Sequence, residues 1–264
     1  MCSTKFTLAA AAVMVALSFA LSVYFYPVLP ESMASHWGIR GNVDGYMQKP
    51  LAAFLMPAML AAMALLFFAI PRIDPLKANI DKFRGHYYGF IVVFCAFILL
   101  LHLQVLLWNV GIRINPASTM PLAMGVLFYY MGVMVENAKR NWFIGIRTPW
   151  TLSSDSVWDK THRLGGRLFK VAGIIALFGV LFPAFAFYFV IVPVLSVVFY
   201  TIIYSYLEFK KEERIGKIPV VSLDIKAVAA PRVSKSSSVR SIRGKKAKKA
   251  GRAGKKKTAV RKGK

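Results

Sequence analysis

The sequence predicts an all-α, polytopic integral membrane helix bundle of about six transmembrane helices, followed by a disordered basic C-terminal tail. Two observations predict this class. Hydrophobic residues make up 57% of the 264 positions and the mean hydropathy is +0.53, whereas soluble domains are about 45–50% apolar. The apolar residues also gather in runs of about twenty, the length that crosses a hydrocarbon core of about 30 Å as a helix. The surplus of apolar side chains is therefore expected to face lipid.

Five apolar runs give six spans. The first follows Lys5 and is longer than the core of a cleavable signal peptide, which indicates a retained helix. The fourth is the shortest and the weakest candidate. The last run, Leu168 to Leu207, is long enough for two spans, with Pro183 and Pro193 bracketing a turn expected near Phe185–Phe189. The expected spans are residues 6–26, 51–70, 87–110, 118–135, 168–186 and 189–207, which together make a membrane domain of residues 1–207.

The connections between the spans alternate between poor and rich in lysine and arginine. The first, third and fifth carry two, one and none of these residues, whereas the second and fourth carry four and six. Cytoplasmic connections hold the excess of basic residues. The pattern predicts a multi-pass protein of the cell membrane with both termini in the cytoplasm, residues 27–50 outside and residues 137–167 inside.

The 27–50 loop is expected to be compact and folded. Its prolines hold the backbone extended or turning, and its glycines permit backbone angles closed to other residues. His36 with Asp44 has the residue types for metal binding or acid–base chemistry. Two ligands are too few for a convincing metal site, so a hydrogen bond that pins the loop is the favoured interpretation. The candidate residues of this loop are Pro30, His36, Gly38, Gly41, Asp44 and Lys49.

The 137–167 loop is the densest polar segment before the tail. Pro149 disfavours a helical backbone at Thr148, and residues 153–155 are good N-caps for a helix that continues into the fifth span. Such a segment is expected to lie along the cytoplasmic interface, with tryptophans among the headgroups and arginines at the phosphates. These side chains are Trp142, Trp150, Trp158, Arg140, Arg147 and Arg163.

A catalytic interpretation of the same loop rests on Asp155, Asp159 and His162, whose spacing places them on one side of a helix. Each has a competing local role, because Asp155 can cap the helix, Asp159 can pair with Arg163 four residues on, and His162 shares a face with Trp158. We therefore expect no catalytic residue, metal or cofactor here. The functional candidates are Asn141, Gly145, Arg147, Thr148, Pro149, Trp150, Trp158, Lys160, His162 and Arg163.

Few residues suggest chemistry inside the membrane. His102, Gln104 and Asn109 are the main polar side chains of the spans; hydrogen bonds between helices are the favoured role, and an ion or substrate pathway is the alternative. Cys2 and Cys95 offer neither a disulfide framework nor metal-ligand spacing. A membrane enzyme, or a small transporter that uses the 137–167 loop or a bundle cavity, remains the alternative class.

The tail, residues 208–264, carries 20 basic and 4 acidic residues. From Arg232 onward it has too few apolar residues to offset the entropy of ordering, so we expect it to be largely disordered. Anionic lipid headgroups are the favoured partner, because the tail is tethered beside the bilayer. Unspecific binding of nucleic acid is possible through counterion release, but this segment has no aromatic side chain for base stacking.

Two motifs resemble one known family. Tyr26-Pro27-x-Leu29-Pro30, with the candidates from His36 to Lys49, resembles the N-terminal domain of unknown function of SdpI-family membrane proteins. Residues 141–153, then Val157-Trp158-x-Lys160-Thr161-His162-Arg163, look like the family's hallmark loop. The resemblance implies a multi-pass membrane protein that is not an enzyme. It also implies immunity to a secreted peptide toxin, and a cytoplasmic repressor held at the membrane as a partner.

Overall fold

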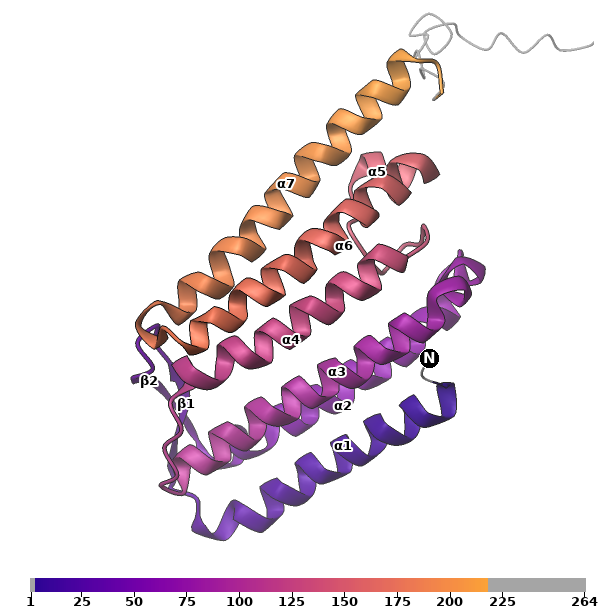
Figure 1. The fold of residues 1–264 in the computed structure, drawn as a ribbon. Helices are drawn as coiled ribbons and strands as arrows, with labels where there is room; N and C mark the ends of the chain where they lie inside the picture. Colours follow the sequence, from indigo (N-terminus) through magenta and orange to yellow (C-terminus); the bar gives the residue numbers. More distant parts are fainter. Residues whose placement is uncertain (1–2, 218–264) are drawn as a thin grey trace, which may run out of the picture. The chain divides into compact units, whose positions relative to one another are not determined.

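The computed structural model describes residues 3–217 (Figure 1). These residues form seven helices and one β-hairpin, with short 3-10 turns at Tyr26–Val28, Phe178–Val180 and Pro183–Phe185. The helices are α1 Thr4–Phe25, α2 Lys49–Ile73, α3 Lys77–Asn109, α4 Pro116–Asn137, α5 Pro149–Ser153, α6 Asp155–Leu177 and α7 Ala186–Arg214, and the strands are β1 Ser32–Trp37 and β2 Val43–Gln48.

Five of these helices, α1, α2, α3, α4 and α7, are long and apolar enough to cross a membrane. The predicted helical membrane bundle is thereby confirmed, and α4 is the least apolar of the five, as its short run predicted. The fifth predicted span, residues 168–186, begins in α6, which is not among these five helices and whose first half carries Asp155, Asp159, Lys160 and Arg163. Helix α6 packs between α4 and α7 along its length (Figure 1), although Asp155 and Arg163 remain exposed on it.

The turn between the last two helices lies at residues 178–185, earlier than the predicted Phe185–Phe189. Pro183 begins the second of its two 3-10 turns, where a missing backbone N–H costs nothing. Pro193, in contrast, lies inside α7, a position that transmembrane helices tolerate. Helix α7 continues to Arg214, past the predicted boundary at residue 207; the remainder of the basic tail, from residue 218, lies outside the described residues.

The 27–50 loop folds into the β1–β2 hairpin, an element that the all-helical prediction did not contain. Asn109, at the end of α3, fixes it to the bundle: its Oδ1 accepts the Ala34 N–H at 2.8 Å, and its Nδ2 donates to the Ala34 carbonyl at 3.0 Å. Met33 is fully buried beneath the strand. Gly41 turns the tip with φ +78° against Asn115, the N-cap of α4. The hairpin is therefore a docked part of the fold.

Polar side chains of the spans form hydrogen bonds between elements, as predicted. The His102 Nε2 lies 3.0 Å from the Ser22 hydroxyl, which joins α3 to α1. The Thr119 hydroxyl donates to the Gln104 Oε1 at 2.6 Å, which joins α4 to α3. With Asn109 in the hairpin contact, all three predicted side chains bind partners on other elements.

Helices α4 and α6 pack with their backbones in contact at two glycine pairs. A Cβ added at Gly132 would lie 2.5 Å from the Gly166 carbonyl oxygen, and one at Gly173 would lie 2.6 Å from that of Gly125. Small residues at a helix interface let two backbones approach this closely. The largest buried cluster lies beside this crossing and is led by Trp158, Tyr87, Phe83, Ile80, Ile91 and Leu60.

Candidate functional site

The connection between α4 and α5 is held by a buried asparagine. The Asn141 Oδ1 accepts the N–H groups of Phe143 and Ile144 at 2.9 and 2.6 Å, and its Nδ2 donates to the carbonyls of Lys139 and Ile144 at 2.8 and 2.9 Å. All four hydrogen bonds stay within the same turn, which is the local use that favours asparagine in loops. Asn141 therefore shapes the loop backbone.

His162 closes this loop from α6. Its ring stacks on Trp158 with centroids 3.8 Å apart, its Nδ1 donates to the Trp158 carbonyl at 2.9 Å, and its Nε2 accepts the Ile146 N–H at 2.9 Å. Gly145 has φ +112°, and a Cβ there would lie 2.4 Å from the Nε2, so the backbone approach requires glycine. Burial lowers the pKa of His162, which precedes the predicted span, to about 4. The imidazole is thus a neutral structural group with both nitrogens occupied.

Trp158 is fully buried and donates its indole N–H to the Ala138 carbonyl at 2.9 Å. The expectation that it lies among headgroups was therefore wrong, because the 137–154 loop folds back over this face of α6. Trp142 is exposed, as expected, whereas Trp150 packs edge-on against Tyr206 of α7 with ring centroids 5.1 Å apart. Only the exposed tryptophan is free to reach a membrane surface.

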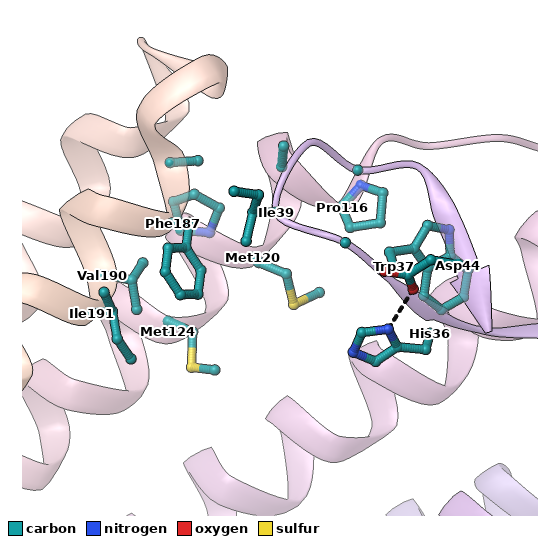
Figure 2. Close-up of a pocket in the computed structure, with 15 residues that line it drawn as sticks. His36, Trp37, Ile39, Asp44, Pro116, Met120, Met124, Phe187, Val190 and Ile191 are labelled. Carbon is teal, nitrogen blue, oxygen red and sulfur yellow. Dashed lines mark hydrogen bonds and ion pairs between the residues drawn. The ribbon is translucent and has the colours of Figure 1, made fainter.

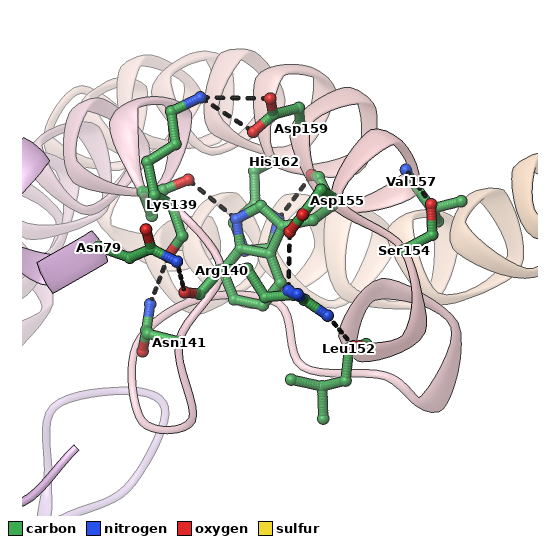
Figure 3. A network of polar contacts seen from close by, with 12 residues as sticks. Asn79, Lys139, Arg140, Asn141, Leu152, Ser154, Asp155, Val157, Asp159 and His162 are labelled. Carbon is green, nitrogen blue, oxygen red and sulfur yellow. Dashed lines mark hydrogen bonds and ion pairs between the residues drawn. The ribbon is translucent and has the colours of Figure 1, made fainter. Parts of the chain in front are cut away.

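The acidic residues of α6 pair with the preceding loop (Figure 3). The Asp155 Oδ1 lies 2.7 Å from the Arg140 Nε, and the Asp159 Oδ1 lies 3.0 Å from the Lys139 Nζ. The predicted pair of Asp159 with Arg163 is wrong, because the end of α4 brings Lys139 against Asp159. Within residues 3–217 no group of three or more His, Cys, Asp or Glu is arranged to hold a metal ion.

Thr148 has the non-helical backbone that the sequence predicted, and Pro149 begins α5, a short helix that the sequence analysis did not contain. Thr148 is the N-cap, and its hydroxyl and that of Thr151 each bind the other residue's backbone N–H in a capping box. The Thr148 hydroxyl also lies 3.0 Å from that of Ser205. This bond, with the Trp150 contact, attaches the loop to α7.

Lys160 contributes a second attachment to α7. Its Nζ donates to Glu208, and to the Glu212 Oε1 at 2.8 Å; Glu212 also accepts the hydroxyls of Ser154 and Ser156 at 3.1 and 2.5 Å. The hydrogen bonds from Lys160 to Glu208 first, and then to Glu212, raise the pKa of the ammonium group. Sequence reasoning assigned both glutamates to the tail, although their spacing of four places them on one helix face.

The connection between α2 and α3 supplies two partners that sequence reasoning also missed. The Asp74 Oδ2 accepts the Trp142 N–H at 2.9 Å, and the Asn79 Nδ2 donates to the Arg140 carbonyl at 2.8 Å. Asp74 is buried. Its position as a lone carboxylate between two apolar spans was the sequence signal that could have identified it as a partner of the loop. The 137–154 loop is thus held from three sides: by α6, by α7 and by this connection.

Two of the predicted basic residues remain at the surface. Arg147 is exposed and donates to the Trp142 carbonyl at 2.5 Å, and Arg163 is exposed on α6. Beside Arg147 lies a cavity of about 360 Å³. Its lining includes Phe90, Met131, Ile146, Arg147, Thr148 and Thr201. This end of the bundle therefore presents a rigid loop with a basic edge and a partly apolar hollow.

At the opposite end, the hairpin borders a larger cavity of about 660 Å³ (Figure 2). His36 and Asp44 lie at its edge, their Nδ1 and Oδ1 atoms 2.5 Å apart, which is the predicted loop-pinning contact. Gly38 and Gly41 line the same edge. Two other candidates lie apart from it. Pro30 is an exposed residue before β1, and Lys49 packs over the Tyr26 ring at 4.8 Å, with Glu31 at 3.5 Å.

The comparisons with known proteins fall on these two regions. Residues 137–205 match the SdpI/YfhL protein family, and residues 13–61 match a domain of unknown function, DUF1648. The immunity protein SdpI of Bacillus subtilis (strain 168) is 28% identical over 201 residues, which cover 75% of this chain and 94% of that protein. No solved structure matches the chain. The resemblance indicated by the two loop motifs is therefore confirmed, and the chain is a multi-pass membrane protein that is similar to the SdpI/YfhL family.

Proposed function

We propose that this protein is an SdpI-like membrane immunity protein that protects its cell against an envelope-active peptide. The observation that carries the proposal is the similarity to an immunity protein over nearly that protein's whole length. Both matched regions fold into built surfaces, the hairpin at one end of the bundle and the 137–154 loop at the other (Figure 1). A protein with only a packing role in the membrane has no need of two such surfaces.

The 137–154 loop is the proposed working surface on the cytoplasmic side. Its buried side chains fix the backbone, so the exposed Arg147 and Trp142 are presented in a defined geometry. A guanidinium group can make charge-assisted contacts, and an exposed indole can anchor at a protein or lipid surface. This geometry supports a second element of the proposal, that the loop and its 360 Å³ cavity hold a cytoplasmic regulator such as a repressor.

The alternatives, a membrane enzyme or a small transporter, have less support. An enzyme in this loop would need the three residues with acid–base chemistry to be available, yet Asp155, Asp159 and His162 are each engaged with a structural partner. A transporter would use polar groups in the spans, and His102, Gln104 and Asn109 bind other elements of the bundle. We therefore favour a binding function without catalysis.

Survival of cells under peptide challenge tests this proposal. Cells lacking the gene are complemented with the wild type or with Arg147→Ala and exposed to fractions of secreted peptides. The wild type should restore survival. Arg147→Ala should reduce it, because a charge-assisted contact of about 1.5–3 kcal/mol is lost from an exposed position that contributes little to folding.

Arg84→Ala is the matched control, since Arg84 is an exposed arginine at the same end of the bundle and outside both matched regions. It should protect as well as the wild type, with the membrane level of each variant checked by blotting. Two results contradict the proposal. The first is that cells lacking the gene survive every fraction as well as complemented cells do. The second is that Arg147→Ala and Arg84→Ala protect equally well at equal abundance.

A further inference from the structure

We propose that the cavity between the β1–β2 hairpin and the first turns of α4 and α7 binds an apolar segment of the peptide itself. This inference rests on the proposed function and names the place where the peptide is recognised. The cavity encloses about 660 Å³, within the roughly 300–1,000 Å³ typical of ligand sites. It can therefore receive a few large apolar side chains.

The walls come from three elements that are distant in sequence (Figure 2). The hairpin tip contributes one side, and α4 and α7 contribute the other two with flexible methionine and branched or aromatic side chains. Methionine adapts to differently shaped apolar partners, which suits recognition of a peptide segment. The principal apolar lining residues are Ile39, Met120, Met124, Phe187, Val190 and Ile191.

The edge of the cavity is polar, which favours a peptide over a lipid chain. His36 and Asp44 stand there with 73% and 52% of their side chains exposed, and the backbone of Gly38 and Gly41 lies beside them. A peptide presents amide groups next to its apolar side chains, and it can use such an edge together with the apolar walls. An acyl chain carries no such groups along its length, and binding of a whole phospholipid through its headgroup is the competing outcome of the test below.

The position of the cavity agrees with this occupant. It lies at the hairpin end of the bundle, which the basic residues predict to face outward. A secreted peptide reaches this boundary before it enters the bilayer. The hairpin belongs to the 13–61 match and α7 to the 137–205 match, so the cavity forms where the two matched regions meet.

Direct binding to the full chain in phosphatidylcholine nanodiscs tests the inference. The probe is a short fluorescein-labelled peptide of leucine and phenylalanine, with protein-free nanodiscs as the baseline. Met124→Trp places a large ring in the cavity and should weaken binding about tenfold or more. Val126→Trp places the same ring on the exposed side of the same helix and should bind like the wild type.

Ile39→Asp is a second variant, at an exposed position of the hairpin tip, and it should also weaken binding without a folding defect. Equal binding by the wild type, Met124→Trp and Ile39→Asp overturns the inference. Native mass spectrometry gives a second result that would overturn it. In that result the wild type retains a phospholipid that the peptide does not displace, and Met124→Trp does not retain it. A further result is that cells lacking the gene resist all peptides while Met124→Trp still weakens binding of the labelled peptide. That result contradicts the proposed immunity function and supports the peptide site.

Discussion

The His162 imidazole stabilises its loop only in the neutral form. Its Nε2 must be unprotonated to accept the Ile146 N–H, while its Nδ1–H donates to the Trp158 carbonyl. Protonation would remove the acceptor and place a charge in a fully enclosed site against Trp158. Burial accordingly lowers the pKa from about 6.5 in an exposed histidine to about 4.

This residue should make stability depend on pH. Between about pH 6.5 and 4 the unfolded chain binds a proton at His162 that the folded chain does not, so the free energy of unfolding should fall as pH is lowered through this range, by up to about 3 kcal/mol. Thermal unfolding in detergent, followed by tryptophan fluorescence at pH 7.5 and pH 5, measures the effect. His162→Gln should be less stable at pH 7.5 and should lose less between the two pH values. The same pH dependence in both proteins would rule out this role.

Local contacts of the loop could be predicted from the sequence, and long-range ones could not. The cap at Ser154 and the shared face of Trp158 and His162 follow from spacing along one helix, and both occur. The partners of Lys160 lie about fifty residues away on α7, and the pairing depends on how two helices dock. Spacing along α6 alone offers Arg163 as the partner of Asp159. The fold brings Lys139, which follows α4, closer, and Asp159 pairs with Lys139 instead.

At the scale of the elements, the α4–α6 crossing depends on the absence of side chains. Gly132 faces the backbone of α6, with the Gly166 oxygen and the Lys170 nitrogen 2.5 and 2.7 Å from a Cβ built there. Backbone atoms cannot rotate away as a side-chain end can. Any larger residue must therefore push the helices apart along their contact.

Gly132→Leu should accordingly lower the unfolding temperature and the membrane level of the protein, with a cost of at least about 1–3 kcal/mol, the usual range for overpacking. Val126→Leu adds volume to the exposed side of α4 and serves as the control. Thermal unfolding of both purified variants in detergent provides the measurement. Equal midpoints for Gly132→Leu and the wild type would show that the helices do not approach this closely.

The membrane helices could be predicted because each long apolar run indicates a spanning helix without reference to any other part of the chain. The hairpin was not, since two six-residue strands around a glycine-rich turn give too little alternation, and their stability comes from Asn109 on another element. The turn at residues 178–185 was misplaced because it lies within a continuous apolar run, where hydropathy marks no boundary. Pro183 was the usable signal, and Pro193 was misleading because a span tolerates it.

At the scale of the whole molecule, the two matched regions place different surfaces at opposite ends of the bundle. The hairpin and its apolar cavity lie at one end, and the loop with Arg147 lies at the other (Figure 1). Three helices, α2, α3 and α4, separate the hairpin from the 137–154 loop along the chain. If all three cross the membrane, as their length and apolar composition allow, these two surfaces face opposite sides of it. The basic residues predict which side each one faces.

Labelling of single cysteines tests this orientation. In a background without Cys2 and Cys95, Ser32→Cys on the hairpin should react with a membrane-impermeant maleimide on intact cells, whereas Ser153→Cys should react only after permeabilisation, because its loop carries the basic excess. Both positions are exposed. The reverse pattern would invert the orientation, and labelling of both from outside would mean that one of the three intervening helices does not cross.

A third cysteine decides whether α6 crosses the membrane despite its charged residues. Phe182→Cys lies in the turn between α6 and α7 and is exposed. If α6 spans the membrane between α4 and α7, this position should label from outside like Ser32→Cys, because α6 would carry the chain back to the hairpin side. Labelling only after permeabilisation would leave the five apolar helices as the only crossings among residues 3–217. The wall that α7 contributes to the 660 Å³ cavity would then face the cytoplasm, and the proposed peptide site would be wrong with it.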